Sequence, residues 1–381
     1  MKNWLFLGIL LVLSSCASNP EVIDQDVPIQ EALPWVSVAS LQGDAVNFSF
    51  NPAALMEGQD LPESVSLAGT FTHWKNDAAF GLTLDPISGI WKGSFPLKII
   101  DVPGNSGMPE FQFVVNYNSR IGGNVAPLGE CWGSNFVVIV PPETTSSLAE
   151  KDLLNKKLRA EWETQEMLSN FRTLSGGSLG NGILNRSYHP FVPSKGYPGE
   201  KERLLAVQKL METRGINTII NLTDSPGIAN SAQVSPYYKT VIDKGNVDFV
   251  VTEYNTVYYE PDQSEFAGQI KEIFSFMGDH DGPYLIHCRL GTDRTGVITA
   301  ILEAFSGVGW ESIKVDYELS NLMGIKEYRS TRLLEYSFTK MLGKKPGESK
   351  DLAADMRIFL VKSGIAEETL NKVLKNLTQV P

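Results

Sequence analysis

The chain has 381 residues and a formal net charge of -11, from 33 Lys and Arg against 44 Asp and Glu. This length allows two folded cores, and the acidic balance argues against nucleic acid or an anionic lipid surface as a partner bound through bulk charge. The chain has 3 cysteines, Cys16, Cys131 and Cys288, which are too few for a disulfide framework.

The first 15 residues have the pattern of an export signal. Lys2 precedes an apolar run over residues 4–13, which is too short to span a bilayer as a mature helix. A Leu-Ser-Ser-Cys sequence ending at Cys16 follows and resembles the cleavage site of bacterial lipoprotein signals. The resemblance implies that residues 1–15 are removed and that Cys16 carries lipid.

A lipid on Cys16 would anchor the protein to a membrane, on the periplasmic or surface side of a bacterial cell envelope. Ala17 follows the cysteine where an Asp would favour inner-membrane retention, so the outer membrane is expected if the cell has one. An ordinary secretory signal is the alternative. Residues 16–34 are Pro-rich and acidic and predict a tether.

The region 35–142 has short strand-like segments separated by Gly, Pro, Asn and Asp. The predicted strands cover residues 44–50, 64–71, 89–95, 111–116 and 135–140. Short strands with turn residues between them are typical of an all-β sandwich. We therefore expect an N-terminal immunoglobulin-like sandwich over these residues.

The order of motifs in this sandwich resembles the immunoglobulin-like modules of glycogen-binding proteins and starch enzymes. A Gly-x-Phe-x-x-Trp sequence ends at Trp74, and the resemblance implies that this side chain stacks on a glucose ring of a bound glycan. Gln112 and Ser119 stand where the family has a sugar-contacting Lys and a second Trp. A purely structural spacer is therefore the open alternative.

Residues 143–180 are predicted to link two domains. The pattern over 144–171 is polar and helical, and the stretch 175–182 is rich in Gly and Ser. From 181 to 381, strand-like segments (181–190, 216–222 and 247–252) alternate with helical ones, beginning at 200–213. This alternation predicts an α/β domain in which helices flank a mostly parallel sheet, with its active site at the carboxyl end of a central strand.

The most informative segment is His-Cys-Arg-Leu-Gly-Thr-Asp-Arg-Thr-Gly at 287–296. The apolar residues before it predict a strand, and 297–305 predict a buried helix. Backbone N–H groups at a helix N-terminus bind phosphate and stabilise an ionised thiol, so we expect Cys288 to be a thiolate. Arg294 adds a planar fork that matches two phosphate oxygens.

The remaining residues of the segment have supporting roles in this prediction. His287 is expected to order the loop, and Thr295 to place a hydroxyl beside the sulfur. The expected phosphate-binding residues are Arg289, Leu290, Gly291, Thr292, Asp293 and Arg294.

This segment resembles the signature of the cysteine-dependent tyrosine phosphatases, including their dual-specificity and phosphoinositide branches. The sequences Arg186-Ser187-Tyr188-His189-Pro190, 216–222 and 309–321 resemble further parts of the same family. The likeness spans about residues 180–325. It implies two-step hydrolysis through a phosphocysteine, with no cofactor and no metal.

The family usually takes the leaving-group proton from an Asp on an upstream loop. Asp262 is the first candidate here, just before a predicted helix. Asp293 is its rival, because some bacterial tyrosine phosphatases and lipid phosphatases carry an Asp before the loop Arg. Glu260 and Glu265 are the remaining candidates.

The expected substrate is a phosphoprotein, cleaved as by a tyrosine or dual-specificity phosphatase. A glucan phosphatase and an inositol-phosphate phosphatase are alternatives, the latter because Arg289 occupies a loop position where phosphoinositide enzymes often have Lys. An alternative of another class is a non-catalytic phospho-binding envelope protein.

Overall fold

In a computed structural model of the chain, the described residues are 35–101, 108–123, 126–127, 129–132, 134–141, 143–150, 153, 164–194, 199–231, 233–323, 329 and 331–379. The predicted signal, Cys16 and the tether lie outside them, as does the middle of the predicted linker. No helix within these ranges is long and apolar enough to cross a membrane.

The N-terminal region consists of antiparallel sheets, as predicted. One sheet has the order β1-β2-β5-β4, and the other has the order β3-β6-β9-β8 with β7 paired to β6. The strands are β1 (Ala39–Gln42), β2 (Ala45–Phe50), β3 (Val65–Gly69), β4 (Thr83–Asp85), β5 (Ile90–Pro96), β6 (Glu110–Val115), β7 (Ser119–Ile121), β8 (Cys131–Trp132) and β9 (Asn135–Val137). Short helices α1 (Pro52–Leu55), η1 (Thr70–Thr72), η2 (Ala78–Phe80) and α2 (Leu97–Ile100) connect them.

The two sheets enclose a core rich in phenylalanine. Burial alternates along β2, so that every second residue points inward. Phe48 of β2 meets Phe111 of β6 edge to face, with ring centroids 4.9 Å apart, and Phe50 lies 4.9 Å from Phe113. Such aromatic pairs add to the free energy gained from burying their area, and they join the two sheets into a sandwich.

The C-terminal region is an α/β domain with a five-stranded sheet of order β10-β11-β14-β12-β13. The strands are β10 (Arg172–Thr173), β11 (Leu184–Ser187), β12 (Thr218–Asn221), β13 (Val247–Phe249) and β14 (Tyr284–His287). All neighbours pair in parallel except the edge strand β10. The predicted mostly parallel sheet is confirmed.

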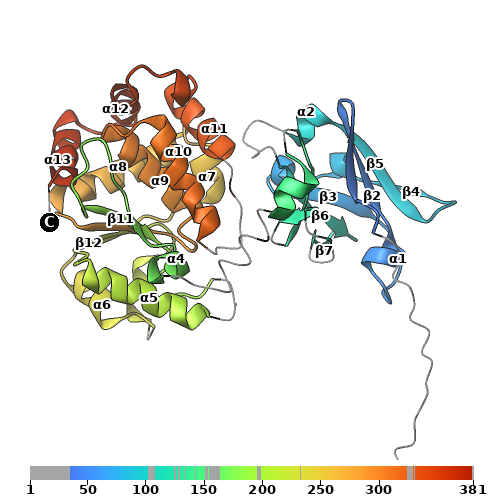
Figure 1. The fold of residues 1–381 in the computed structure, drawn as a ribbon, viewed down its shortest axis with the longest axis horizontal. Coiled ribbons are helices and arrows are strands. Elements are labelled where there is room, and N and C mark those ends of the chain that lie inside the picture. Colours follow the sequence, from blue (N-terminus) through green and yellow to red (C-terminus); the bar gives the residue numbers. More distant parts are fainter. Residues whose placement is uncertain are drawn as a thin grey trace, which may run out of the picture. The chain divides into compact units, whose positions relative to one another are not determined.

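Helices cover both faces of this sheet (Figure 1). On one face lie α4 (Gln165–Ser169), α5 (Glu200–Thr213) and α6 (Pro236–Asp243). On the other lie α7 (Tyr254–Tyr259), α8 (Ser264–Asp279), α9 (Asp293–Phe305), α10 (Trp310–Leu322), α11 (Thr331–Leu342), α12 (Leu352–Lys362) and α13 (Glu367–Leu377). Ile219 joins the core under α5 and α6, whereas Ile220 joins the opposite core. All four residues of β12 are accordingly buried, as expected for a strand covered on both faces, and the apolar pair Ile219 and Ile220 forms its centre.

Part of the predicted linker belongs to the α/β domain. Residues 165–169 form α4, and β10 pairs with β11 at the edge of the sheet. Phe171 and Leu174 are buried in the two cores of the domain. The polar helical pattern that suggested a linker therefore includes the first elements of the domain.

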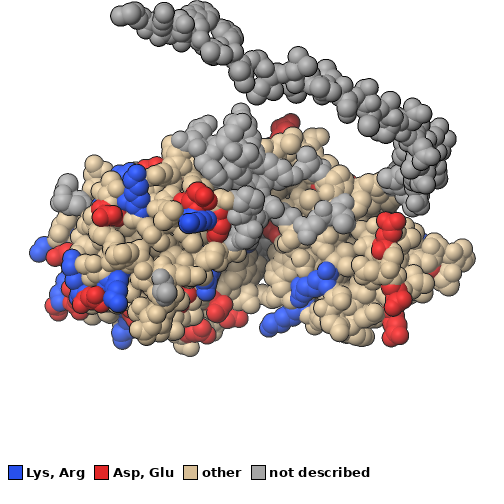
Figure 2. Space-filling model, turned by 90° about the horizontal axis from the view of Figure 1, so that it is seen from below, with Lys and Arg blue, Asp and Glu red and all other residues tan. Residues whose placement is uncertain are grey.

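Acidic and basic side chains alternate on the face formed by α5 and α6 (Figure 2). On α5, the exposed charges run Lys201, Glu202, Lys209 and Glu212. The net negative charge of the chain is therefore not gathered into one acidic patch on this face.

Candidate active site

The segment 288–292 connects β14 to α9 at the carboxyl end of the sheet. In register, His287 of β14 lies between Ser187 of β11 and Asn221 of β12. Because parallel strands end at the same edge, the segments that follow β11 and β12 flank the loop. Cys288 is only 2% exposed, and it lies at the base of the loop.

The first two carbonyl groups after the cysteine point away from the centre of the loop. The backbone N–H of His189 donates to Arg289 O at 3.2 Å, and Asn170 Nδ2 donates to Leu290 O at 2.9 Å. In a trans peptide the carbonyl and the following N–H point in opposite directions. The N–H groups that follow these carbonyls therefore turn inward.

From beneath the loop, Arg186 holds the next two carbonyl groups so that they also point outward. This fully buried side chain donates from Nη2 to Gly291 O at 2.8 Å and to Thr292 O at 3.3 Å. Four consecutive carbonyls are thus held outward, and their inward N–H groups form a concave anion-binding nest. The N-terminus of α9 adds its dipole to this nest.

Gly291 is required by this geometry. Its φ is +73°, and a Cβ at this position would lie 2.3 Å from Ser187 O. A side chain would therefore push the loop away from β11.

Arg186 is fixed by a buried charge cluster. Its Nη1 donates to Asp316 Oδ2 at 2.6 Å, and Arg172 Nε donates to Asp316 Oδ1 at 2.6 Å. Burial raises the pKa of the Asp316 carboxyl, but the charges of Arg172 and Arg186 outweigh it and lower that pKa. Burial, with the charge of Asp316 adding to it, raises the pKa of Glu303 well above its usual range. Two guanidinium groups then share one carboxylate, which leaves positive charge under the loop.

Arg294 lies at the first turn of α9 and reaches the segments that follow β12 and β13. Its Nη1 donates to Leu222 O and to Thr252 O, each at 3.1 Å. Within the described residues, Nε and Nη2 form no hydrogen bond, so one edge of the guanidinium fork is left for a phosphate.

Residues 202–379 match the tyrosine phosphatase family. This part of the chain is a tyrosine phosphatase family domain, and the enzyme is a cysteine-dependent phosphatase. No curated protein matches the chain. The match begins within α5, so the phosphatase loop and α9 lie inside it, whereas Asn170, Arg186 and His189 precede it.

His287 orders the phosphatase loop through its ring. Asn221 Nδ2 donates to Tyr238 Oη at 3.3 Å, so the tyrosine hydroxyl hydrogen is available to His287 Nε2, 3.2 Å away. The proton on Nδ1 then points to Cys288 O at 3.4 Å. Burial holds the pKa of His287 well below its usual range. The ring is therefore neutral and is suited to positioning the loop, not to acting as a base.

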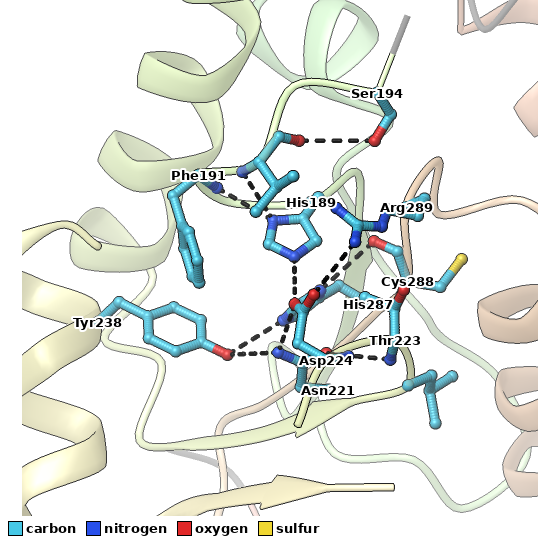
Figure 3. A network of polar contacts seen from close by, with 12 residues as sticks. His189, Phe191, Ser194, Asn221, Thr223, Asp224, Tyr238, His287, Cys288 and Arg289 are labelled. Carbon is cyan, nitrogen blue, oxygen red and sulfur yellow. Dashed lines mark hydrogen bonds and ion pairs between the residues drawn. The ribbon is translucent and has the colours of Figure 1, made fainter. Parts of the chain in front are cut away.

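A second histidine of the network holds Asp224 at the rim of the phosphatase site (Figure 3). His189 Nδ1 accepts from the backbone N–H groups of Phe191 and Val192 at 3.2 and 3.0 Å. Its proton is thus on Nε2, which donates to Asp224 Oδ2 at 2.6 Å. Asp224 Oδ1 lies 3.4 Å from Arg289 Nη2.

The two candidate acids lie in different surroundings. Asp293 Oδ1 accepts from Tyr258 Oη at 3.1 Å and from Arg329 Nε at 2.7 Å. The side chain of Asp262 is 40% exposed and pairs with Lys340 Nζ of α11 at 3.3 Å. Only Asp293 shares the loop with Cys288 and Arg294.

The remaining predicted residues are placed as follows. The hydroxyls of Thr292 and Thr295 are buried and form no hydrogen bond within the described residues, so none joins Thr295 to the sulfur. Glu265 contacts Gln269 of its own helix, and Glu260 caps the end of α7. None of these contacts involves the loop.

Trp74 belongs to the sandwich and lies in the turn after η1. It is half-buried, and its carbonyl accepts from Arg120 Nη2 at 2.7 Å. Two residues after Trp74, Asn76 donates from Nδ2 to the carbonyl of Tyr117, which lies in the turn between β6 and β7. The side chain of Tyr117 is 74% exposed. Two aromatic residues thus lie in adjacent turns of the sandwich.

Four residues of the phosphatase site were not predicted from the sequence, namely Asn170, Arg186, His189 and Asp224. A signal existed for three of them. Arg186 and His189 belong to the family-like segment after residue 185, and Asp224 follows strand β12. Polar residues at the carboxyl ends of parallel strands are expected at a site.

Proposed function

We propose that the enzyme hydrolyses phosphotyrosine, and with it phosphoserine or phosphothreonine, in proteins through a phosphocysteine on Cys288. The thiolate attacks phosphorus, the P–O ester bond breaks, and the leaving oxygen takes a proton. Water then attacks the phosphocysteine, and inorganic phosphate leaves. Arg294 and the inward N–H groups stabilise charge on the phosphoryl oxygens in both steps.

The observation that carries this proposal is the nest of inward N–H groups over a nearly inaccessible sulfur. Cys288 is 2% exposed, so the reacting phosphate must enter the loop to reach it. A phosphate on an extended aromatic ring suits such a recessed nucleophile. This depth favours phosphotyrosine over the shorter phosphoserine.

We assign the role of general acid, which protonates the leaving oxygen, to Asp293 in preference to Asp262. Asp293 lies in the loop beside Arg294, and its Oδ1 is fixed by Tyr258 and Arg329. That leaves Oδ2 for the leaving group. Asp262 is instead occupied by Lys340 at an exposed position.

The test of the proposed function is Cys288→Ser, assayed with a phosphotyrosine peptide, a phosphoserine peptide, an inositol phosphate and phosphorylated glucan. Cys131→Ser is the matched control, because it removes the other described thiol, in the sandwich. We expect the control to retain activity, whereas the hydrolytic activity of Cys288→Ser should fall at least about a thousandfold. Residual activity of Cys288→Ser within about tenfold of wild type would refute the phosphocysteine step.

Arg294→Lys tests the fork in the same assay. Lysine keeps the charge but presents one point donor in place of a planar pair. We expect kcat/KM to fall by about a hundredfold or more. The match of residues 202–379 to the tyrosine phosphatase family argues against the alternative of a non-catalytic phospho-binding protein.

A glycan-binding role for the sandwich is a second candidate, favoured by the exposed Tyr117 in the turn beside Trp74. Stacking of an aromatic plane on the apolar face of a sugar needs such side chains. Binding of the full chain to amylose should be lost in Trp74→Ala and reduced in Tyr117→Ala. Equal retention of wild type and both variants on amylose would refute this role and, with it, the basis for a glucan phosphatase.

A further inference from the structure

Arg289 is the charged residue that directly follows the nucleophile. Its side chain is 40% exposed, and its Nη2 lies 3.4 Å from Asp224 Oδ1. The pair therefore joins a solvent-accessible guanidinium at the rim to a carboxylate that is 5% exposed. Of the two partners, the arginine has the freedom to move.

Asp224 is fixed by three hydrogen bonds to two residues, His189 and Asn221 (Figure 3). Its Oδ2 accepts from His189 Nε2 at 2.6 Å and from Asn221 Nδ2 at 3.1 Å. Its backbone N–H donates to Asn221 Oδ1 at 3.1 Å. A carboxylate held this way is preorganised and does not follow the arginine.

The same contacts keep Asp224 ionised. Burial raises the pKa of this carboxyl, but the hydrogen bond from His189, followed by those of its other partners, lowers the pKa to about 2. At neutral pH the site therefore places a fixed negative charge opposite Arg289.

We propose that Asp224 neutralises Arg289 and thereby selects against polyphosphorylated substrates at the phosphatase site. This selection rests on the proposed function, because it favours a substrate whose only strong anion near the loop is the reacting phosphate, as in phosphotyrosine. A second phosphate that approached Arg289 would meet the charge of Asp224 at a similar distance. The Coulomb gain and cost then largely cancel.

The alternative role for Asp224 is to hold Arg289 in position for a second phosphate. The two roles predict opposite signs for one substitution. Asp224→Asn retains a side-chain oxygen that accepts from His189, yet it removes the negative charge. If Asp224 is a selectivity element, the variant binds polyanions more tightly. If it positions Arg289, the variant binds them more weakly.

The experiment measures the inhibition constant of inositol hexakisphosphate against p-nitrophenyl phosphate hydrolysis. This readout requires only phosphatase activity, so it remains informative even if phosphotyrosine is not the substrate. The phosphotyrosine-peptide assay of wild type separately tests the proposed function. Asp243→Asn, which removes an exposed carboxylate from α6, controls for net charge.

In Asp224→Asn we expect the inhibition constant to fall about tenfold, as one uncompensated charge at the rim would give. Inhibition by inorganic phosphate should change less than about threefold, because that ion occupies the loop alone. In the double variant Asp224→Asn, Arg289→Met, the constant should return to the wild-type value. An unchanged or raised constant in Asp224→Asn overturns the proposal.

Arg289→Met alone keeps the proposal testable if Asp224→Asn does not fold. It leaves the charge of Asp224 uncompensated, so the inhibition constant of inositol hexakisphosphate should rise at least about threefold. The inhibition constant of inorganic phosphate should rise less. An unchanged constant for the hexakisphosphate would overturn the proposal.

Discussion

Arg186 donates to Asp316 at 2.6 Å directly beneath the phosphate loop. The same guanidinium holds the carbonyls of Gly291 and Thr292, so one buried side chain connects strand β11, helix α10 and the loop. The shape of the catalytic loop therefore depends on a residue about a hundred positions earlier in the chain.

We predict that Arg186→Lys weakens catalysis more than it weakens the fold. Lysine keeps the buried charge beside Asp316 but does not span Asp316 and two carbonyls at once. The N–H groups would lose their common direction, so kcat/KM for p-nitrophenyl phosphate should fall at least about tenfold, and iodoacetamide should alkylate Cys288 more slowly.

The matched control for Arg186→Lys is Arg214→Lys, because Arg214 forms an exposed pair with Glu166 and exposed pairs contribute little. If Cys288 were alkylated at the wild-type rate in Arg186→Lys while the melting temperature fell, the role of Arg186 would be merely structural.

A second prediction separates the two candidate acids. Phenyl phosphate needs a proton on its leaving oxygen in the transition state, whereas a nitrophenyl leaving group needs it less. Asp293→Asn should therefore reduce kcat/KM for phenyl phosphate about tenfold more than for p-nitrophenyl phosphate, and it should flatten the basic limb of the pH–rate profile. Asp262→Asn serves as the control and should leave both unchanged. The reverse result would restore Asp262 as the acid.

A third prediction concerns Asp248 in β13. Burial, followed by the nearby charge of Glu272, raises the pKa of this carboxyl from 3.8 to about 6, so the folded protein binds this proton more tightly than the unfolded chain. The contribution of this carboxyl to the stability of the fold is fully present below about pH 4 and is lost as the pH rises through about 6. Asp248→Asn should then stabilise the protein by about 1 kcal/mol near pH 8, after allowance for solvent screening, and by nothing near pH 4.

Urea denaturation of wild type and Asp248→Asn at the two pH values measures this difference. Asp243→Asn, on the surface of α6, controls for the change in net charge. A stabilisation that is the same at both pH values would disprove the titration of Asp248.

The fourth prediction tests the anchor, which we propose from the signal-like N-terminus. Cells labelled with a fatty-acid analogue should tag the wild type but not Cys16→Ala, because lipidation needs that thiol. Cys131→Ala is the matched control and should be tagged. Equal labelling of wild type and Cys16→Ala would assign the chain to the ordinary secreted class.

The sequence was most informative where structure is local. The strand, loop and helix around Cys288 were predicted because nucleophile, turn glycine and helix follow one another directly. The helix begins at Asp293 rather than at residue 297, since the polar residues of the loop also form its first turn. β8, with two residues, and β7, with three, are too short for a periodic pattern to reveal.

The contacts that shape the site were not accessible in the same way. Arg186 and Asp224 act through partners that are distant in sequence, and only the fold brings them to the loop. The pairing of Asp262 with Lys340 depends likewise on how α11 packs. A pattern of residue types predicts which side chains have the right chemistry, but not which of them are paired with another residue in the fold.

Asn170, Arg186 and His189 all precede residue 202, where the likeness to the family begins. A fragment that started there would contain the nucleophile, the arginine and the whole of α9, yet its loop carbonyls would lack three of their donors. The smallest independently active piece of this phosphatase must therefore extend back to α4, and any transplant of the loop into another protein must carry the side chains of Asn170 and Arg186 and the backbone N–H of His189 with it.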